Sequence, residues 1–165
     1  MNLKELIPQK LQERFPQVKF EFVDYRGDLS VNFDKDHVIE ICRFLKEDSE
    51  LEFRLCEDVT AVDMAERKKR FMVVYHIFSL KHNFRLRLKV PLPGEESDWN
   101  IDSVTSVWKA ANWLERETYD MFGIIFNNHP DLRRMYMPED FQYHPLRKDF
   151  PLMGIPGSLP LPKKD

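Results

Sequence analysis

The residues best suited to chemistry are crowded into one short stretch of the sequence. Three carboxylates, Glu115, Glu117 and Asp120, lie there around Arg116. Paired carboxylates can serve as a general acid and a general base. An arginine and an aspartate four positions apart share one face of a helix, however, and more often form a structural ion pair. We therefore predict an ion pair between Arg116 and Asp120, with acid–base catalysis as the lesser alternative.

Two tryptophans, Trp108 and Trp113, lie in the same stretch. A helix face that meets only water seldom carries two tryptophans, whereas tryptophan and arginine are enriched at the centres of protein–protein interfaces. The pattern therefore favours a buried contact with another protein over catalysis at this helix.

The remaining histidines and cysteines indicate neither a metal site nor a bound cofactor. No two of the five histidines are four residues apart, as helix-borne metal ligands are. His129 and His144 each precede a proline in expected loops, where proton transfer is a minor alternative. Cys42 and Cys56 are too few for an iron–sulfur cluster, which usually takes four thiolates. We expect this chain to bind no metal and no cofactor.

Composition excludes several further classes of protein. The 165 residues fit one domain, and 25 basic against 28 acidic side chains give a net charge of −3, which does not indicate a nucleic-acid partner. The basic run Arg67–Arg70 is most simply a solvated connection between strands. The longest uncharged apolar run, Phe71–Leu80, has ten residues, whereas a membrane-spanning helix needs about 20. We expect no secretory signal and no direct membrane span.

The hydrophobic pattern predicts helices and strands in the first two-thirds of the chain. Apolar residues recur at helical spacing near residues 3–15 and 38–45, and Asp34 or Asp36 can cap the second helix. Alternating apolar residues predict a hairpin at 18–22 and 29–33 and two further strands at 51–55 and 84–90. The run at 71–80 is apolar on both faces and so predicts a central strand. This order predicts a two-layer α+β domain with helices on one face of a mixed sheet.

A third helix and an extended segment complete the predicted architecture. The helix is expected to begin at Asp102 or Ser103 and to present an apolar stripe from Val104 to Leu114. Seven of the eleven prolines lie at or after Pro130, interleaved with aromatic residues, so this segment cannot form a regular helix or a central strand. We therefore predict an α+β domain at 1–125 and an extended, proline-rich, partner-binding tail at 126–165.

Two motifs resemble a known family. The run Glu115–Tyr136 resembles the signature of the C subunit of respiratory NADH:quinone oxidoreductase, the 30-kDa subunit of complex I, and His144–Leu152 resembles that family's tail. The predicted order of helices and strands agrees with the family's fold. Eight residues of the two motifs are candidate family-motif or interface residues: Glu115, Arg116, Glu117, Asp120, His129, Arg133, His144 and Arg147. Trp113, which the tryptophan pattern indicates as an interface residue, is the ninth.

The resemblance implies a structural role within a large enzyme. A subunit of this family is a cofactor-free part of the peripheral arm and packs against the D subunit (the 49-kDa type) near the quinone site. The other hydrophilic-arm subunits, of the B, I, E, F and G types, are further expected partners. The complex passes electrons from NADH through FMN and iron–sulfur clusters to quinone and translocates protons. The chain is accordingly expected at the cytoplasmic face of a bacterial inner membrane, as a peripheral protein.

Three alternatives remain open. The equivalent subunit of a membrane-bound hydrogenase, or of a ferredoxin- or deazaflavin-fed complex, shares the motif region. A freestanding acid–base enzyme would use Glu115, Glu117 or His129 and would need a pocket in the isolated chain. A nucleic-acid-binding module using Arg67–Arg70 would bind with strong salt dependence.

Overall fold

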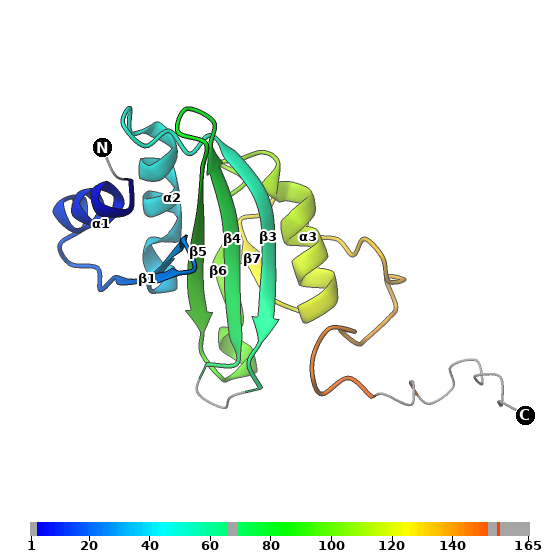
Figure 1. Cartoon of the computed structure of the whole chain (residues 1–165). Coiled ribbons are helices and arrows are strands. Elements are labelled where there is room, and N and C mark those ends of the chain that lie inside the picture. The colour runs from blue at the N-terminus through cyan, green and yellow to red at the C-terminus, as the bar shows by residue number, and fades with distance from the viewer. Residues whose placement is uncertain (1–2, 66–68, 152–154, 156–165) are drawn as a thin grey trace, which may run out of the picture.

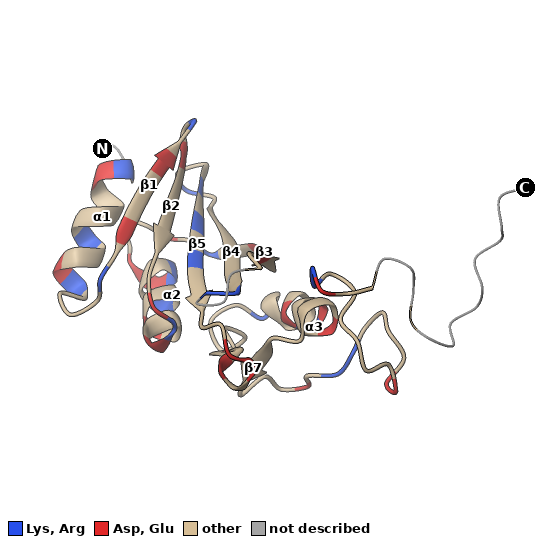
Figure 2. Cartoon of the chain, turned by 90° about the horizontal axis from the view of Figure 1, so that it is seen from below, with Lys and Arg blue, Asp and Glu red and all other residues tan. Residues whose placement is uncertain are grey.

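A computed structural model describes residues 3–65, 69–151 and 155 of the chain. Within them, a five-stranded sheet has the order β1-β2-β5-β4-β3. Figure 1 shows β5, β4 and β3 side by side, and Figure 2 shows the whole order. The five strands are β1 (Glu21–Tyr25), β2 (Asp28–Asn32), β3 (Leu55–Asp63), β4 (Phe71–Ser79) and β5 (Phe84–Leu92). Strand β2 runs parallel to β5 and the other neighbours are antiparallel, so the predicted mixed sheet is confirmed.

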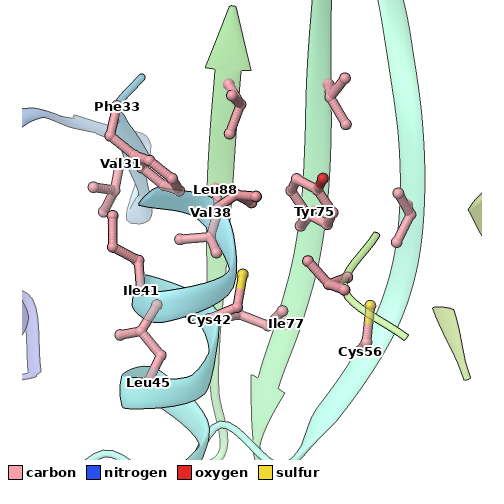
Figure 3. Packing of buried hydrophobic residues seen from close by; sticks show 14 of the residues in the cluster. Val31, Phe33, Val38, Ile41, Cys42, Leu45, Cys56, Tyr75, Ile77 and Leu88 are labelled. Carbon is pink, nitrogen blue, oxygen red and sulfur yellow. The ribbon is translucent and has the colours of Figure 1, made fainter. Parts of the chain in front are cut away.

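The three α-helices are α1 (Leu3–Arg14), α2 (Val38–Glu47) and α3 (Ala111–Phe122). Helices α2 and α3 lie on one face of the sheet, which confirms the two-layer α+β class (Figure 2). Figure 3 shows Val38, Ile41 and Leu45 of α2 beside Val31 and Leu88 of the sheet, and all five are at most 1% exposed. Burying a side chain of this size contributes roughly 1.5–3 kcal/mol, so α2 is fixed mainly by this apolar layer.

The strand predicted at 51–55 is wrong, because β3 occupies Leu55–Asp63 instead. Leu51 and Phe53 are fully buried, but the backbone around them forms a turn bonded to the end of α2, with Leu51 N–H on the Asp48 carbonyl and Phe53 N–H on the Leu45 carbonyl. In β3 itself, an irregularity between Cys56 and Asp58 shifts the register. The shift breaks the alternation that would have predicted a strand there.

The predicted start of the third helix is also wrong. Helix α3 begins at Ala111, and turns occupy residues 103–110. Asp102 ends a short strand, β6 (Asn100–Asp102), which pairs in parallel with β7 (Ile125–Asn127). Strands of three residues carry too few positions for a periodic pattern, and neither was predicted.

The segment after β7 lies against the domain over residues 131–150, where its backbone and side chains bond to α3 and to the end of β3. The boundary expected between residues 125 and 126 lies inside β7. Of the basic run at 67–70, Arg67 and Lys68 lie outside the described residues. Arg70 forms ion pairs with Asp63 and Asp149.

Candidate docking site around helix α3

Asp120 is the centre of the polar network at the carboxyl-terminal half of α3. One of its carboxylate oxygens accepts the backbone N–H groups of Met135, Tyr136 and Met137, at 3.0, 2.7 and 3.0 Å. The other accepts an N–H of Arg134 at 2.6 Å. Burial alone would raise the pKa of Asp120, but these donors hold it below its usual range. The carboxylate therefore stays ionised and fixes the loop at 134–137.

Arg116 does not pair with Asp120, so the predicted ion pair is wrong. Its guanidinium donates instead to the carbonyls of Arg133 and Arg134, at 3.0 and 3.1 Å. It also lies over the ring of Trp113, with 4.9 Å between the guanidinium carbon and the ring centroid. The two charges thus hold the same loop from two sides, because Arg116 binds its carbonyls while Asp120 binds its N–H groups.

Glu115 is fully buried and joins α3 to the turn before it. Its carboxylate accepts the hydroxyl of Ser103 at 2.6 Å and the N–H of Val104 at 2.8 Å. Burial raises the pKa of Glu115 to about 7, against the lowering effect of those two hydrogen bonds. Ser103 Oγ also accepts the N–H of Thr105 at 3.2 Å, so this side chain holds the turn before α3 and does not cap the helix, which begins at Ala111.

His129 supports the other end of this region. Its side chain is fully buried, 3.9 Å from a carboxylate oxygen of Glu115. Nδ1 accepts the N–H of Asp131, and Nε2 donates to the carbonyl of Asn112. Both ring nitrogens are used by backbone groups, so the imidazole acts as a fixed link between α3 and the following loop.

Glu117 and Arg133, which the sequence also singled out, lie at the surface. Glu117 is exposed on α3. Arg133 donates to both carboxylate oxygens of Asp131, at 2.7 and 2.8 Å, and two-thirds of its side chain is exposed. An ion pair this exposed contributes little to stability, so both residues are free to meet a partner.

His144 and Arg147 close the carboxyl-terminal end of α3. His144 Nδ1 donates to the carbonyl of Asp120, Leu146 N–H to that of Met121, and Arg147 Nε to that of Phe122, at 2.9, 3.1 and 2.6 Å. The last carbonyls of a helix otherwise lack partners within it, and a cation there is favoured by the helix dipole. The proline-rich segment therefore serves as the cap of its own helix.

Gly123 makes this close approach possible. It has φ +75°, and a Cβ at this position would overlap a nitrogen of Arg147 and lie 2.6 Å from one of His144. The proline-rich segment is also bound at Lys148, whose N–H donates to the Asp63 carboxylate at 2.9 Å. Asp63 in turn pairs with Arg70 at 3.2 Å.

The structure thus brings Arg116, Asp120, His144 and Arg147 together in one network and Glu115 and His129 in a second. Sequence reasoning missed Arg134 and Asp63. The position of Arg134 inside the motif is the only available signal, because its carboxylate partner is fourteen residues away.

The region around α3 leaves several large apolar side chains exposed and offers little reactive chemistry. Glu115 is shielded from solvent, and no three His, Cys, Asp or Glu side chains among the described residues are placed to hold a metal ion. Beside the polar networks, Trp113 is 61% and Tyr136 59% exposed, and Tyr143 and Leu146 are also exposed. Large exposed apolar side chains of this kind mark interaction surfaces when they gather.

Comparison with known proteins identifies the relatives of this chain. Residues 31–156 match the family described as respiratory-chain NADH dehydrogenase, 30 Kd subunit. The chain is 49% identical over 152 residues to the C subunit of NADH-quinone oxidoreductase from Geobacter metallireducens, covering 92% of this chain and 91% of the relative. It is 44% identical over 144 residues to the corresponding C subunit from Roseiflexus sp., covering 87% and 82%.

Two solved structures share the fold. A trypsin-resistant fragment of Nqo5 is 32% identical, with a TM-score of 0.61, covering 76% of this chain and 98% of the fragment. A chain of the membrane-bound sulfane sulfur reductase, an archaeal respiratory membrane complex, has a TM-score of 0.77 at 23% identity, covering 92% and 88%.

The fold and these matches place the chain in the class of respiratory-chain NADH dehydrogenase subunits. Within that class it belongs to the 30-kDa subunit family of complex I, as the motif at Glu115–Tyr136 predicted. It is therefore a subunit of an enzyme complex of electron transport that is associated with a membrane. Among the described residues, no helix has both the length and the apolar character needed to cross a bilayer.

Proposed function

We propose that this chain is a non-catalytic, cofactor-free structural subunit of the peripheral arm of proton-translocating NADH:quinone oxidoreductase. It packs against the D subunit near the quinone site and holds that subunit in place while electrons pass from NADH through FMN and iron–sulfur clusters to quinone. FMN and the clusters belong to other subunits, of the B, I, E, F and G types. The assembly lies on the cytoplasmic face of the bacterial inner membrane.

One observation carries this proposal. The buried charged motif residues are engaged in holding this chain's own backbone, whereas Trp113, stacked on Arg116 at the same site, is left 61% exposed. A site built for acid–base catalysis would leave a titratable group open to substrate. A rigid, pre-ordered surface with exposed aromatic side chains suits docking, because little further ordering is needed on binding.

The test is Trp113→Ala in the native chain, followed by purification of the complex in mild detergent. Tyr25→Ala is the matched control, because Tyr25 is 65% exposed on β1 and also lies beside an arginine, 5.2 Å from its ring centroid. We expect Trp113→Ala to reduce the D subunit recovered with this chain several-fold and Tyr25→Ala to leave it unchanged. A Trp113→Ala complex that assembles fully but turns over slowly would contradict a purely structural role.

The same preparation separates the leading function from its relatives. FMN, iron and NADH oxidation in the purified assembly support the NADH:quinone oxidoreductase. Nickel without flavin would identify a membrane-bound hydrogenase, and flavin-free oxidation of ferredoxin would identify a ferredoxin-fed complex.

A further inference from the structure

A pocket of about 440 Å³ lies away from the Asp120 network, where β3 begins and the turns before α3 pass. The starts of β3 and α3 lie at the same end of the molecule (Figure 1). Ten residues line the pocket: Lys46, Arg54, Leu55, Cys56, Thr105, Ser106, Val107, Trp108, Lys109 and Ala110. The proposed function makes no use of it.

All the charged residues that line the pocket are positive. Three of the lining residues are cations, two carry hydroxyl groups and none is acidic. Lys46 donates to the carbonyl of Val107, and Arg54 pairs at 2.9 Å with Glu52, which does not line the pocket. Lys109 is exposed, and its ammonium has no ion-pair or hydrogen-bond partner among the described residues. Burial raises the pKa of Cys56 to about 12, so its thiol adds no negative charge at neutral pH.

The rest of the lining is apolar. Leu55 is 42% exposed, and Cys56, Val107, Ala110 and the largely buried Trp108 supply the remaining apolar surface. A positive site with an apolar lining fits a carboxylate that is flanked by an apolar side chain, since each part then has a complementary surface.

The pocket adjoins the surface assigned to docking. Lys109 lies four residues before Trp113. Both Lys109 and Ala110 line the pocket, directly before the first residue of α3, Ala111. We propose that this pocket receives an acidic segment of a neighbouring subunit, with an aspartate or glutamate side chain near Lys109 and an adjacent apolar side chain on Leu55. The inference rests on the proposed function, because it extends the docking surface that contains Trp113.

Charge reversal tests the pocket separately from that surface. Lys109→Glu is compared with Lys69→Glu, which alters a second exposed lysine that has no ion pair among the described residues and lies at another pocket. In the purified complex, the measurement is the apparent dissociation constant of this chain over a series of salt concentrations. We expect Lys109→Glu to weaken retention about tenfold or more at low salt and to flatten its salt dependence, because an attractive charge contact has become repulsive. Lys69→Glu should change neither.

Trp113→Ala in the same assay separates the two proposals. Loss of retention with Trp113→Ala but not with Lys109→Glu overturns the pocket while the proposed function stands. Loss with Lys109→Glu alone supports the pocket and removes Trp113 from the docking surface. If the complex retains this chain with Lys109→Glu and also with Trp113→Ala, both the pocket and the docking role of the surface at Trp113 are overturned.

The nature of the occupant has its own test. A photoreactive benzoylphenylalanine in place of Ser106, an exposed lining residue, is activated in the purified complex and the cross-linked peptide is sequenced. An Asp or Glu within two residues of an apolar side chain at the cross-link supports the proposal. A cross-linked peptide without an acidic residue, or none from another subunit, overturns it.

Discussion

At the scale of single residues, two buried carboxylates on α3 behave in opposite ways. Asp120 has an arginine and three backbone N–H donors and stays ionised. Glu115 has one hydroxyl and one N–H donor, and burial outweighs them. A carboxylate's charge state is thus decided by the balance between its burial and the donors that the fold supplies, which the sequence alone cannot report.

The raised pKa of Glu115 predicts a specific pH dependence of stability. Between the ordinary value of 4.5 and about 7, the folded protein holds a proton on Glu115 that the unfolded chain has lost. The free energy of unfolding therefore falls as pH rises through this window, by on the order of 3 kcal/mol from this group, and its contribution levels off above it. Glu115→Gln keeps the shape of the side chain and should remove the effect.

The free energy of unfolding is measured by urea denaturation at several pH values for the wild type and for Glu115→Gln. The result is the difference in this free energy between the two proteins at each pH. His76 and His144, whose pKa values burial lowers, make stability rise with pH over a nearby range, but they are present in both proteins and cancel. A difference that stays constant between pH 4.5 and 7 would show that Glu115 titrates normally.

At the scale of elements, the end of α3 depends on Gly123 for two reasons. The left-handed φ of +75° strains any other residue, and an added Cβ would displace His144 and Arg147 from the carbonyls that they cap. Gly123→Ala should therefore cost about 3 kcal/mol or more, from roughly 1–2 kcal/mol of backbone strain and about 1 kcal/mol for each lost hydrogen bond.

Gly27→Ala is the matched control for this prediction. Gly27 also has a left-handed φ, of +95°, but its Cβ would meet nothing closer than the Lys4 ammonium at 3.9 Å. Gly27→Ala should therefore cost only the backbone strain. Denaturation gives the two costs, and hydrogen exchange at the amides of Leu146 and Lys148 should accelerate only in Gly123→Ala. Equal costs would mean that the cap contributes nothing.

The elements also show what the sequence could predict. Helix α2 and β5 follow from periodic apolar residues, β4 follows from an uninterrupted apolar run, and the fold class follows from their order. The hairpin follows as well, but its first strand lies at Glu21–Tyr25 instead of 18–22, since β1 buries only Phe22 in part. The errors lie where polar contacts replace periodicity: Ser103 bonds to Glu115 and to the Thr105 N–H within a turn, and α3 begins eight residues later, at Ala111. For the site, the motif identified the right residues, but Arg116 and Asp120 find partners in a loop that no helical spacing could reveal.

At the scale of the whole molecule, the polar network makes the segment 131–150 part of the domain over its described length. Trypsin can report this, because cleavage needs both a free basic side chain and a locally opened backbone. Arg134 is only 10% exposed and Arg133 has its carbonyl held by Arg116, whereas Lys148 has an exposed side chain. We expect cleavage after Lys148 to precede cleavage after Arg133 or Arg134.

Asp120→Ala should reverse that order by removing the carboxylate on which Arg134 and the three N–H groups converge. Breaking a buried ion pair costs about 3–5 kcal/mol, which corresponds to an increase of about 100-fold or more in local opening and in the rate of cleavage after Arg134. Asp131→Ala is the control, since it removes only the exposed pair with Arg133. Mass spectrometry of timed digests gives both rates. If the two variants are cleaved after Arg134 equally fast, Asp120 does not hold the segment, and the docking surface beside Trp113 is not pre-ordered by this network.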